Sequence, residues 1–84
     1  MRQKRVCYSY KTYKGELKLI ESLQNFGEWD LSLDNTFIGT YVDPWQAAED
    51  ASKSDFVNQT LVQLLKYVPI PSDLERWKKS LRWI

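Results

Sequence analysis

The stretch from Glu28 to Ser52 has the sequence EWDLSLDNTFIGTYVDPWQAAEDAS, and it decides the fold of this chain. Apolar and polar residues alternate over residues 29–34, the period of two that puts apolar side chains on one face of a β-strand. Asp34 and Asn35 tolerate left-handed backbone angles, and a β-rich run follows over residues 37–42. The sequence therefore predicts a β-hairpin.

The length of the hairpin loop decides which face of the second strand joins the face of Leu31. A loop of two or four residues puts the even-numbered residues there, namely Ile38, Thr40 and Val42. A loop of three residues turns the strand over and puts the odd-numbered residues there, namely Phe37, Gly39 and Tyr41. We favour the even loop.

A helix start follows the hairpin at Asp43-Pro44-Trp45-Gln46. Asp43 supplies an acceptor at the N-cap, proline at the first helical position needs no N–H, and Gln46 completes a capping box. The small residues Ala47, Ala48 and Ala51 would allow this helix to approach the sheet closely. Packing explains these alanines without any ligand.

The C-terminal third has the spacing of two further helices. The first carries its apolar face on Phe56, Val57, Thr60, Leu61, Leu64 and Leu65, with Ser54 or Asp55 as its cap. It ends before Val68-Pro69-Ile70-Pro71, because closely spaced prolines favour extended backbone. The second begins at Ser72, pairs Ser72 with Glu75 in a capping box, and places one stripe on Leu74, Trp77, Leu81 and Ile84.

The N-terminal third predicts strands. Residues 6–13 alternate, and the period of two continues after Gly15, which indicates one bent strand or two short ones. Residues 1–5 are basic, and we expect them to be frayed. We therefore predict one α+β domain over residues 1–84: a three- to four-stranded antiparallel sheet with one helix packed on it and two C-terminal helices.

Tryptophans are expected to supply much of the core of so short a chain. Trp29, Trp45 and Trp77 each sit on an apolar stripe, so we predict that each buries its ring. Trp83 lies next to the C-terminal residue and should tolerate substitution better.

The composition excludes several functional classes. The 84 residues include one cysteine and no histidine, so an intramolecular disulfide, a Cys/His zinc site and any imidazole dyad are excluded. With three glycines and no carboxylate paired at a catalytic spacing, we predict no enzyme, no cofactor and no metal. The chain has neither an apolar run near 18 residues nor a signal-peptide pattern, which predicts a soluble cytoplasmic protein that does not enter a membrane.

Charge is segregated along the chain although the net charge is only +1. Residues 1–18 carry a net +5, residues 19–55 a net −7 and residues 56–84 a net +3. One interpretation is that the basic ends neutralise the acidic middle within one compact fold. The other is that the asymmetry steers association with a partner of opposite charge. We therefore expect a basic protein surface to bind the acidic residues of the hairpin-helix unit, namely Glu28, Asp30, Asp34, Asp43, Glu49 and Asp50.

An alternative site lies in the basic N-terminal strand, where tyrosines could stack on bases while lysines and arginines contact phosphates. This hypothesis predicts a small sheet-based DNA- or RNA-binding protein. Its binding residues would be Arg2, Lys4, Arg5, Tyr8, Tyr10, Lys11 and Lys14.

The run WDLSLDNTFIGTYVDPWQAAEDAS resembles the hairpin-plus-helix of the AP2-type and phage-integrase arm-type DNA-binding domains. The resemblance implies that fold for about 24 residues. In those families the strands carry arginine and lysine into the major groove. Here Asp30, Ser32 and Asp34 hold those positions, and acidic side chains repel phosphates, so we expect the fold without the DNA-binding function.

The format of a short single domain with segregated charge is similar to small phage-encoded host-takeover proteins, including anti-CRISPR inhibitors. The elements YKG-x-L, GEWDLSLDN-x-FIGTY-x-DPWQAAEDA and PSDLERW also look like small uncharacterised bacterial and phage proteins. The resemblance implies a protein-binding inhibitor or adaptor. Its acidic face would occupy a basic nucleic-acid-binding surface of a host complex.

Overall fold

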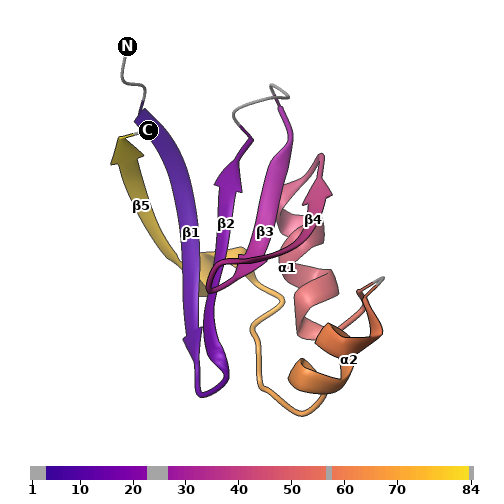
Figure 1. Cartoon of the computed structure of the whole chain (residues 1–84). Helices are drawn as coiled ribbons and strands as arrows, with labels where there is room; N and C mark the ends of the chain where they lie inside the picture. Colours follow the sequence, from indigo (N-terminus) through magenta and orange to yellow (C-terminus); the bar gives the residue numbers. More distant parts are fainter. Residues whose placement is uncertain (1–3, 23–26, 57, 84) are drawn as a thin grey trace.

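In the computed structural model, which describes residues 4–22, 27–56 and 58–83, five antiparallel strands form one sheet. The strands are β1 (Lys4–Thr12), β2 (Gly15–Glu21), β3 (Trp29–Leu33), β4 (Thr36–Tyr41) and β5 (Lys78–Trp83). The helical segments are α1 (Pro44–Ser52), α2 (Gln59–Leu65) and the 3-10 turn η1 (Leu74–Arg76). The strand order is β4-β3-β2-β1-β5, so the first four strands form a meander and β5 returns to pair with β1 (Figure 1).

The core lies between one face of the sheet and the helical segments. Leu17 and Leu19 on β2 pair with Leu33 and Leu31 on β3, and all four are almost fully buried. The helical side contributes Ala47, Ala48, Ala51, Leu61, Leu65 and Leu74 to the same cluster. The three alanines are fully buried, which fits the close approach of α1 that the sequence predicted.

The β3–β4 hairpin contains both a short turn and a β-bulge. Leu33 pairs with Thr36, so the loop has the two residues Asp34 and Asn35, and Asp34 has a φ of 52°. The expected even loop is therefore confirmed. The expected face is confirmed for Ile38, which packs against the core, and is wrong beyond it, because the register shift puts Gly39 opposite Leu31 and Tyr41 opposite Trp29. An extra residue in a bulge turns the rest of the strand over as a change in loop length would.

The start of α1 agrees with the predicted capping signal. Asp43 Oδ1 accepts a hydrogen bond of 3.0 Å from the Trp45 N–H, and Pro44 is the first helical residue. The predicted capping box is not among the described contacts, because the Gln46 side chain donates instead to Asp50 Oδ1 at 2.8 Å, one turn further along. After the helix, Ser54 has a φ of 52° and its hydroxyl donates to the Leu65 carbonyl at 2.8 Å, which ties α1 to α2.

The prediction of two C-terminal helices and at most four strands is wrong. The capping residue is Asp73, whose Oδ1 accepts from the Glu75 N–H, and only η1 forms before the chain becomes extended at Trp77. Residues 78–83 then pair with residues 4–9 of β1. The free edge of β1 offers backbone hydrogen bonds along its length, and this tertiary pairing overrides the helical spacing.

Two smaller expectations also need correction. The N-cap of α2 is Asn58, whose Oδ1 accepts from the Thr60 N–H, rather than Ser54 or Asp55. Arg5 lies within β1 rather than in a frayed end. Residues 1–3, Val57 and Ile84 lie outside the described residues. None of the described helices has the length and apolar character needed to span a bilayer.

Tryptophan burial follows the prediction only in part. Trp77 is 3% exposed, and Trp29 is partly buried against the core. Trp45 is 47% exposed, so the expected burial of its ring is wrong. The second residue of α1 points away from the alanine face, because a helix turns about 100° per residue.

Candidate binding surface

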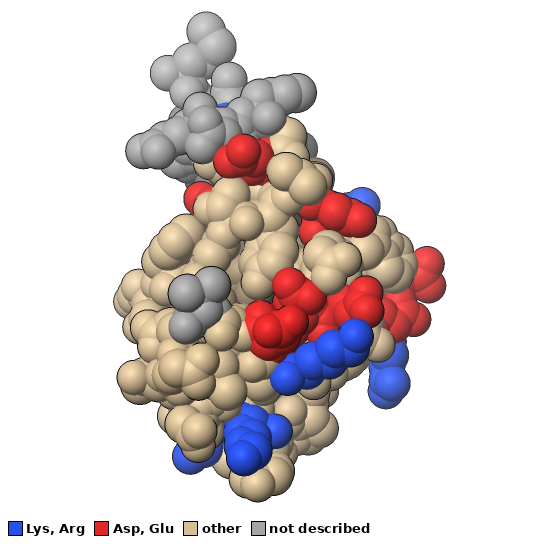
Figure 2. All heavy atoms as spheres, turned by 90° about the vertical axis from the view of Figure 1, so that its right-hand side faces the viewer, with Lys and Arg blue, Asp and Glu red and all other residues tan. Residues whose placement is uncertain are grey.

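A hollow lined by acidic residues lies between β4 and the end of α1. Its volume is about 430 Å³, and its lining residues are Ile38, Gly39, Thr40, Tyr41, Asp50, Asp55 and Phe56. We call it the acidic hollow. Figure 2 faces this side of the molecule and shows Asp and Glu side chains gathered in its middle, with Lys and Arg mostly below them.

The two carboxylates of the acidic hollow form no ion pair within the described residues, although the Lys53 ammonium lies near them. A hydrogen bond to Glu49 raises the pKa of Lys53, and the charges of Asp50 and Asp55 raise that pKa further. Among the described residues the ion pairs are Lys18–Glu16 at 3.6 Å and Lys53–Glu49 at 3.0 Å, and neither includes Asp50 or Asp55. The Asp50 carboxylate accepts a hydrogen bond of 2.8 Å from the neutral Gln46 side-chain amide. The hollow therefore keeps a negative field.

The pKa of the Tyr41 hydroxyl is affected by its burial and by this negative field. Burial of its hydroxyl raises the pKa of Tyr41 above its ordinary 10.0, and the charges of Asp50 and Asp55 raise that pKa further. Both effects act in the same direction, because each disfavours the negatively charged phenolate. Tyr41 therefore stays a neutral hydrogen-bond donor on the wall of the acidic hollow.

Replacing Asp50 and Asp55 with asparagine should lower the pKa of Tyr41 without returning it to 10.0, since burial remains. A raised folded-state pKa stabilises the protein fully below the unfolded value, and that stability is lost as pH rises through the folded pKa. The decline in stability above pH 10 should therefore become smaller in this variant. NMR titration of ring-labelled tyrosine measures the pKa directly, and an unchanged value would contradict the proposed field.

The structure distributes the six acidic residues predicted as a site over several places. Glu49 and Asp50 lie on α1, and Asp43 caps its start. Asp30 lies on the sheet face opposite the helices and accepts from the Thr40 hydroxyl of β4 at 2.9 Å. Glu28 precedes β3, where its carbonyl accepts from the Ser22 N–H.

Asp34 is separated from this group by the length of β4. It lies in the β3–β4 turn, whereas Tyr41 ends the strand. Its Oδ1 accepts from the Glu16 N–H at 3.0 Å, and its own N–H donates to the Glu16 carbonyl at 2.8 Å. Asp34 therefore joins two hairpins instead of contributing to the acidic hollow.

Sequence reasoning missed Tyr41 and Asp55 as site residues. Asp55 was counted in the acidic segment but follows α1, and its place depends on the left-handed turn at Ser54. Tyr41 reaches the hollow because of the bulge at Ile38. A bulge leaves no reliable signal in a single sequence, so only the acidic composition of the region could be predicted.

The alternative basic site is divided among different surfaces. Tyr8 and Tyr10 face the helical side, where their ring centroids lie 5.8 Å from Trp29 and 6.1 Å from Trp77. Arg5 and Lys11 lie on the other face of β1, because residues alternate along a strand. Lys14 lies in the β1–β2 turn, Lys4 begins β1, and Arg2 lies outside the described residues.

A second hollow, of about 580 Å³, lies where β1 and β5 meet. Its polar lining residues are Ser9, Lys11, Glu16, Arg76, Lys78 and Ser80. We call it the mixed-charge hollow. The pairing of Ser9 with Lys78 brings cations from both ends of the chain together, which the helical interpretation of residues 72–84 could not predict.

Within the described residues, no group of three or more carboxylates or thiols is placed to hold a metal ion. The chain matches no protein-family model, no curated protein and no solved structure in the comparisons. The resemblances to DNA-binding modules and to small phage proteins therefore stay predictions.

Proposed function

We propose that this chain is a non-enzymatic binding protein that uses the acidic hollow to bind a basic surface of another protein. The observation that carries the proposal is the pair Asp50 and Asp55, which lie beside Tyr41 without an ion pair in the described part of the chain. Complementary charge accelerates encounter and selects partners. Arginine suits such a site, because its planar group binds carboxylates at two points.

The neighbouring strand supports the same proposal. In the described sheet β4 is an edge strand, and edge strands carry backbone groups that can pair with an extended partner segment. Phe37 on β4 is 59% exposed and Val42 just after it is 80% exposed, so apolar contacts are available at both ends. A basic extended segment could thus pair with β4 while its cations contact Asp50 and Asp55.

The partner class that fits this chemistry is a protein with a basic nucleic-acid-binding groove. By occupying the groove, the chain would act as an inhibitor or adaptor of the host complex. This is also the activity that the resemblance to phage-encoded proteins implies. No chemical step is required of the acidic hollow in this role.

Reversing both charges with Asp50→Lys and Asp55→Lys should abolish partner binding. Loss of one member of a buried charge pair typically weakens binding by about 2–5 kcal/mol, and reversal adds repulsion. The measurement is quantitative capture of proteins from a host lysate on immobilised wild-type protein and on the variant. Proteins retained by the wild type alone should be basic and should lose nucleic-acid binding in the complex.

The matched control is Glu75→Lys, which makes the same charge change at another exposed carboxylate, on η1. It is compared with Asp55→Lys alone, because Asp55 is also exposed. We expect binding to be lost with Asp55→Lys and kept with Glu75→Lys. Equal losses in the two variants would mean that overall charge, not the acidic hollow, governs association.

A further inference from the structure

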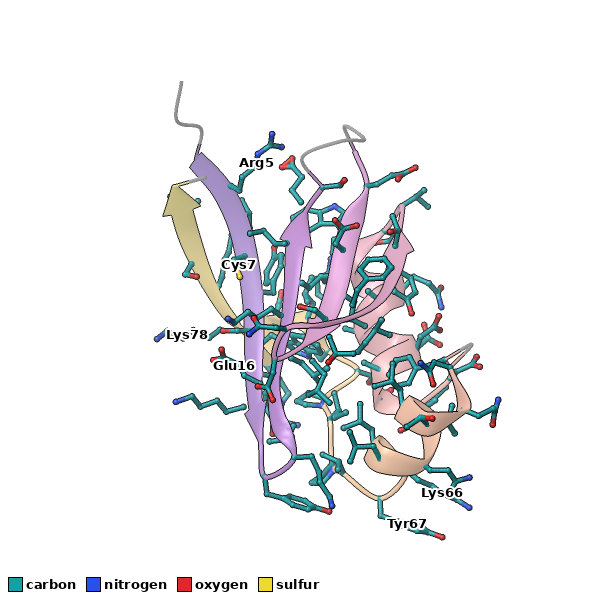
Figure 3. All side chains as sticks on the ribbon, viewed as in Figure 1. Arg5, Cys7, Glu16, Lys66, Tyr67 and Lys78 are labelled. Atoms are coloured by element: carbon teal, nitrogen blue, oxygen red, sulfur yellow. The ribbon has the colours of Figure 1, made fainter. Side chains whose placement is uncertain are left out.

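Two tyrosines from distant parts of the sequence line one hollow at an end of the molecule. Tyr13 lies in the β1–β2 turn and is 74% exposed, whereas Tyr67 follows α2 and is 82% exposed. The hollow has a volume of about 470 Å³, and its other lining residues are Lys14, Thr60, Gln63 and Leu64. We call it the tyrosine hollow. Figure 3 shows Tyr67 and Lys66 at the lower end of the molecule, where the β1–β2 hairpin also turns.

Both rings are attached to well-anchored backbone. In the β1–β2 turn, the Thr12 hydroxyl donates to the Gly15 carbonyl at 2.8 Å and accepts from the Lys14 N–H at 3.0 Å. After α2, Val68 and Ile70 are buried, and Tyr67 precedes them on the exposed side of the chain. The backbone on both sides of the tyrosine hollow is therefore ordered before any ligand arrives, which lowers the entropic cost of binding.

A lysine accompanies each ring. The Lys14 ammonium lies 5.7 Å from the Tyr13 ring centroid, and the Lys66 ammonium lies 5.4 Å from that of Tyr67. Among the residues that the structure describes, no acidic one lines the tyrosine hollow, whereas Asp50 and Asp55 line the acidic hollow and Glu16 lines the mixed-charge hollow. An anionic ligand therefore meets no repelling carboxylate on these walls.

Exposed aromatic rings beside lysines suit one class of ligand. Unpaired bases stack on aromatic side chains whatever their sequence, and lysines contact the phosphates one sugar away. The Thr60 hydroxyl and the Gln63 amide also line the hollow and can hydrogen-bond to base edges. A duplex does not fit as well, because its bases are already stacked on one another.

We propose that the tyrosine hollow binds single-stranded DNA or RNA, with bases stacked on Tyr13 and Tyr67 and phosphates on Lys14 and Lys66. This site is separate from the acidic hollow and does not depend on the protein-binding function proposed there. It also differs from the basic site predicted from the sequence, because Tyr8 and Tyr10 pack against Trp29 and Trp77.

The test is fluorescence anisotropy with labelled oligo-dT, oligo-rU and a duplex of equal length at low ionic strength. Single strands should bind more tightly than the duplex. Tyr13→Ala and Tyr67→Ala should each weaken binding about 10-fold, the effect of losing one stacked base. The phenylalanine variants should retain wild-type binding, since they keep the ring. Lys14→Ala and Lys66→Ala should each reduce the salt-dependence slope by about 0.7.

Phe37→Ala and Lys78→Ala are the matched controls, because they remove an exposed ring from β4 and an exposed cation from β5. Both should leave binding unchanged. The proposal is overturned if single strands do not bind, if the duplex binds equally well, or if Tyr67→Ala and Phe37→Ala have equal effects. If Lys78→Ala weakens single-strand binding and Lys66→Ala does not, the proposal is also overturned, because the nucleic acid would then bind in the mixed-charge hollow.

Discussion

Replacing Trp77 with alanine is expected to lower the free energy of unfolding by about 3–5 kcal/mol. The ring is 3% exposed, its centroid lies 6.1 Å from that of Tyr10, and its Nε1–H donates to the Pro71 carbonyl at 2.9 Å. The substitution removes the packing and leaves that carbonyl without its donor. Because small domains have total stabilities of only about 5–15 kcal/mol, the variant should be close to unfolding.

Trp45→Ala is the control for this prediction. Trp45 is 47% exposed, so its truncation removes much less buried surface and should cost far less than that of Trp77. Urea unfolding followed by circular dichroism gives the midpoint and slope for each variant. Similar midpoints for Trp45→Ala and Trp77→Ala would show that the Trp77 side chain does not stabilise the core.

Gly15→Ala is expected to cost about 2–4 kcal/mol, a large effect for a single methyl group. Gly15 has a φ of +139°, which L-residues rarely adopt, and such backbone strain costs about 1–3 kcal/mol. An added Cβ would also lie 2.6 Å from Asp34 Oδ2. Asp34 would have to move, which endangers its hydrogen bond to the Glu16 N–H, worth about 1 kcal/mol.

Alanine variants of the other two glycines separate the cost of backbone strain from the cost of the contact with Asp34. At Gly27 the φ is +87° and an added Cβ meets no described residue within 4 Å, so Gly27→Ala should show the backbone cost alone. At Gly39 the nearest atom would be Tyr41 Cε2 at 3.8 Å, an ordinary contact, so Gly39→Ala should have the smallest effect. The urea midpoint should therefore be highest for Gly39→Ala, lower for Gly27→Ala and lowest for Gly15→Ala. A Gly15→Ala variant as stable as Gly39→Ala would contradict the contact between the two hairpins.

For the candidate site, the sequence predicted the negative charge of the region but not the residues that form the site. The composition shows that residues 19–55 carry a net negative charge, but among the described acidic residues of this segment only Asp50 and Asp55 line the acidic hollow. Which residues line the acidic hollow could not be predicted from the sequence. Tyr41 depends on an inserted residue in a strand, and Asp55 depends on a left-handed turn at a serine.

The tyrosine hollow could not be predicted from the sequence, because its residues come from distant parts of the chain. Tyr13 and Lys14 are neighbours in the sequence, but Tyr67, with Lys66 beside its ring, joins them only after the helical layer has packed on the sheet. In one sequence an exposed tyrosine has the same appearance as a buried one. Tyr8 and Tyr10 look like surface residues of a basic strand, yet they pack against tryptophans.

The sequence by itself determined the local elements whose signals act over a few residues. These are the alternation of β3, the two-residue turn at Asp34-Asn35 and the helix start at Asp43. Only the tertiary structure decided the rest. Residues 78–83 have helical spacing but form β5, because the open edge of β1 offers more hydrogen bonds than a short helix end would keep. The bulge at Ile38 likewise appears only in the pairing of β4 with β3, which propensity over a few residues does not encode.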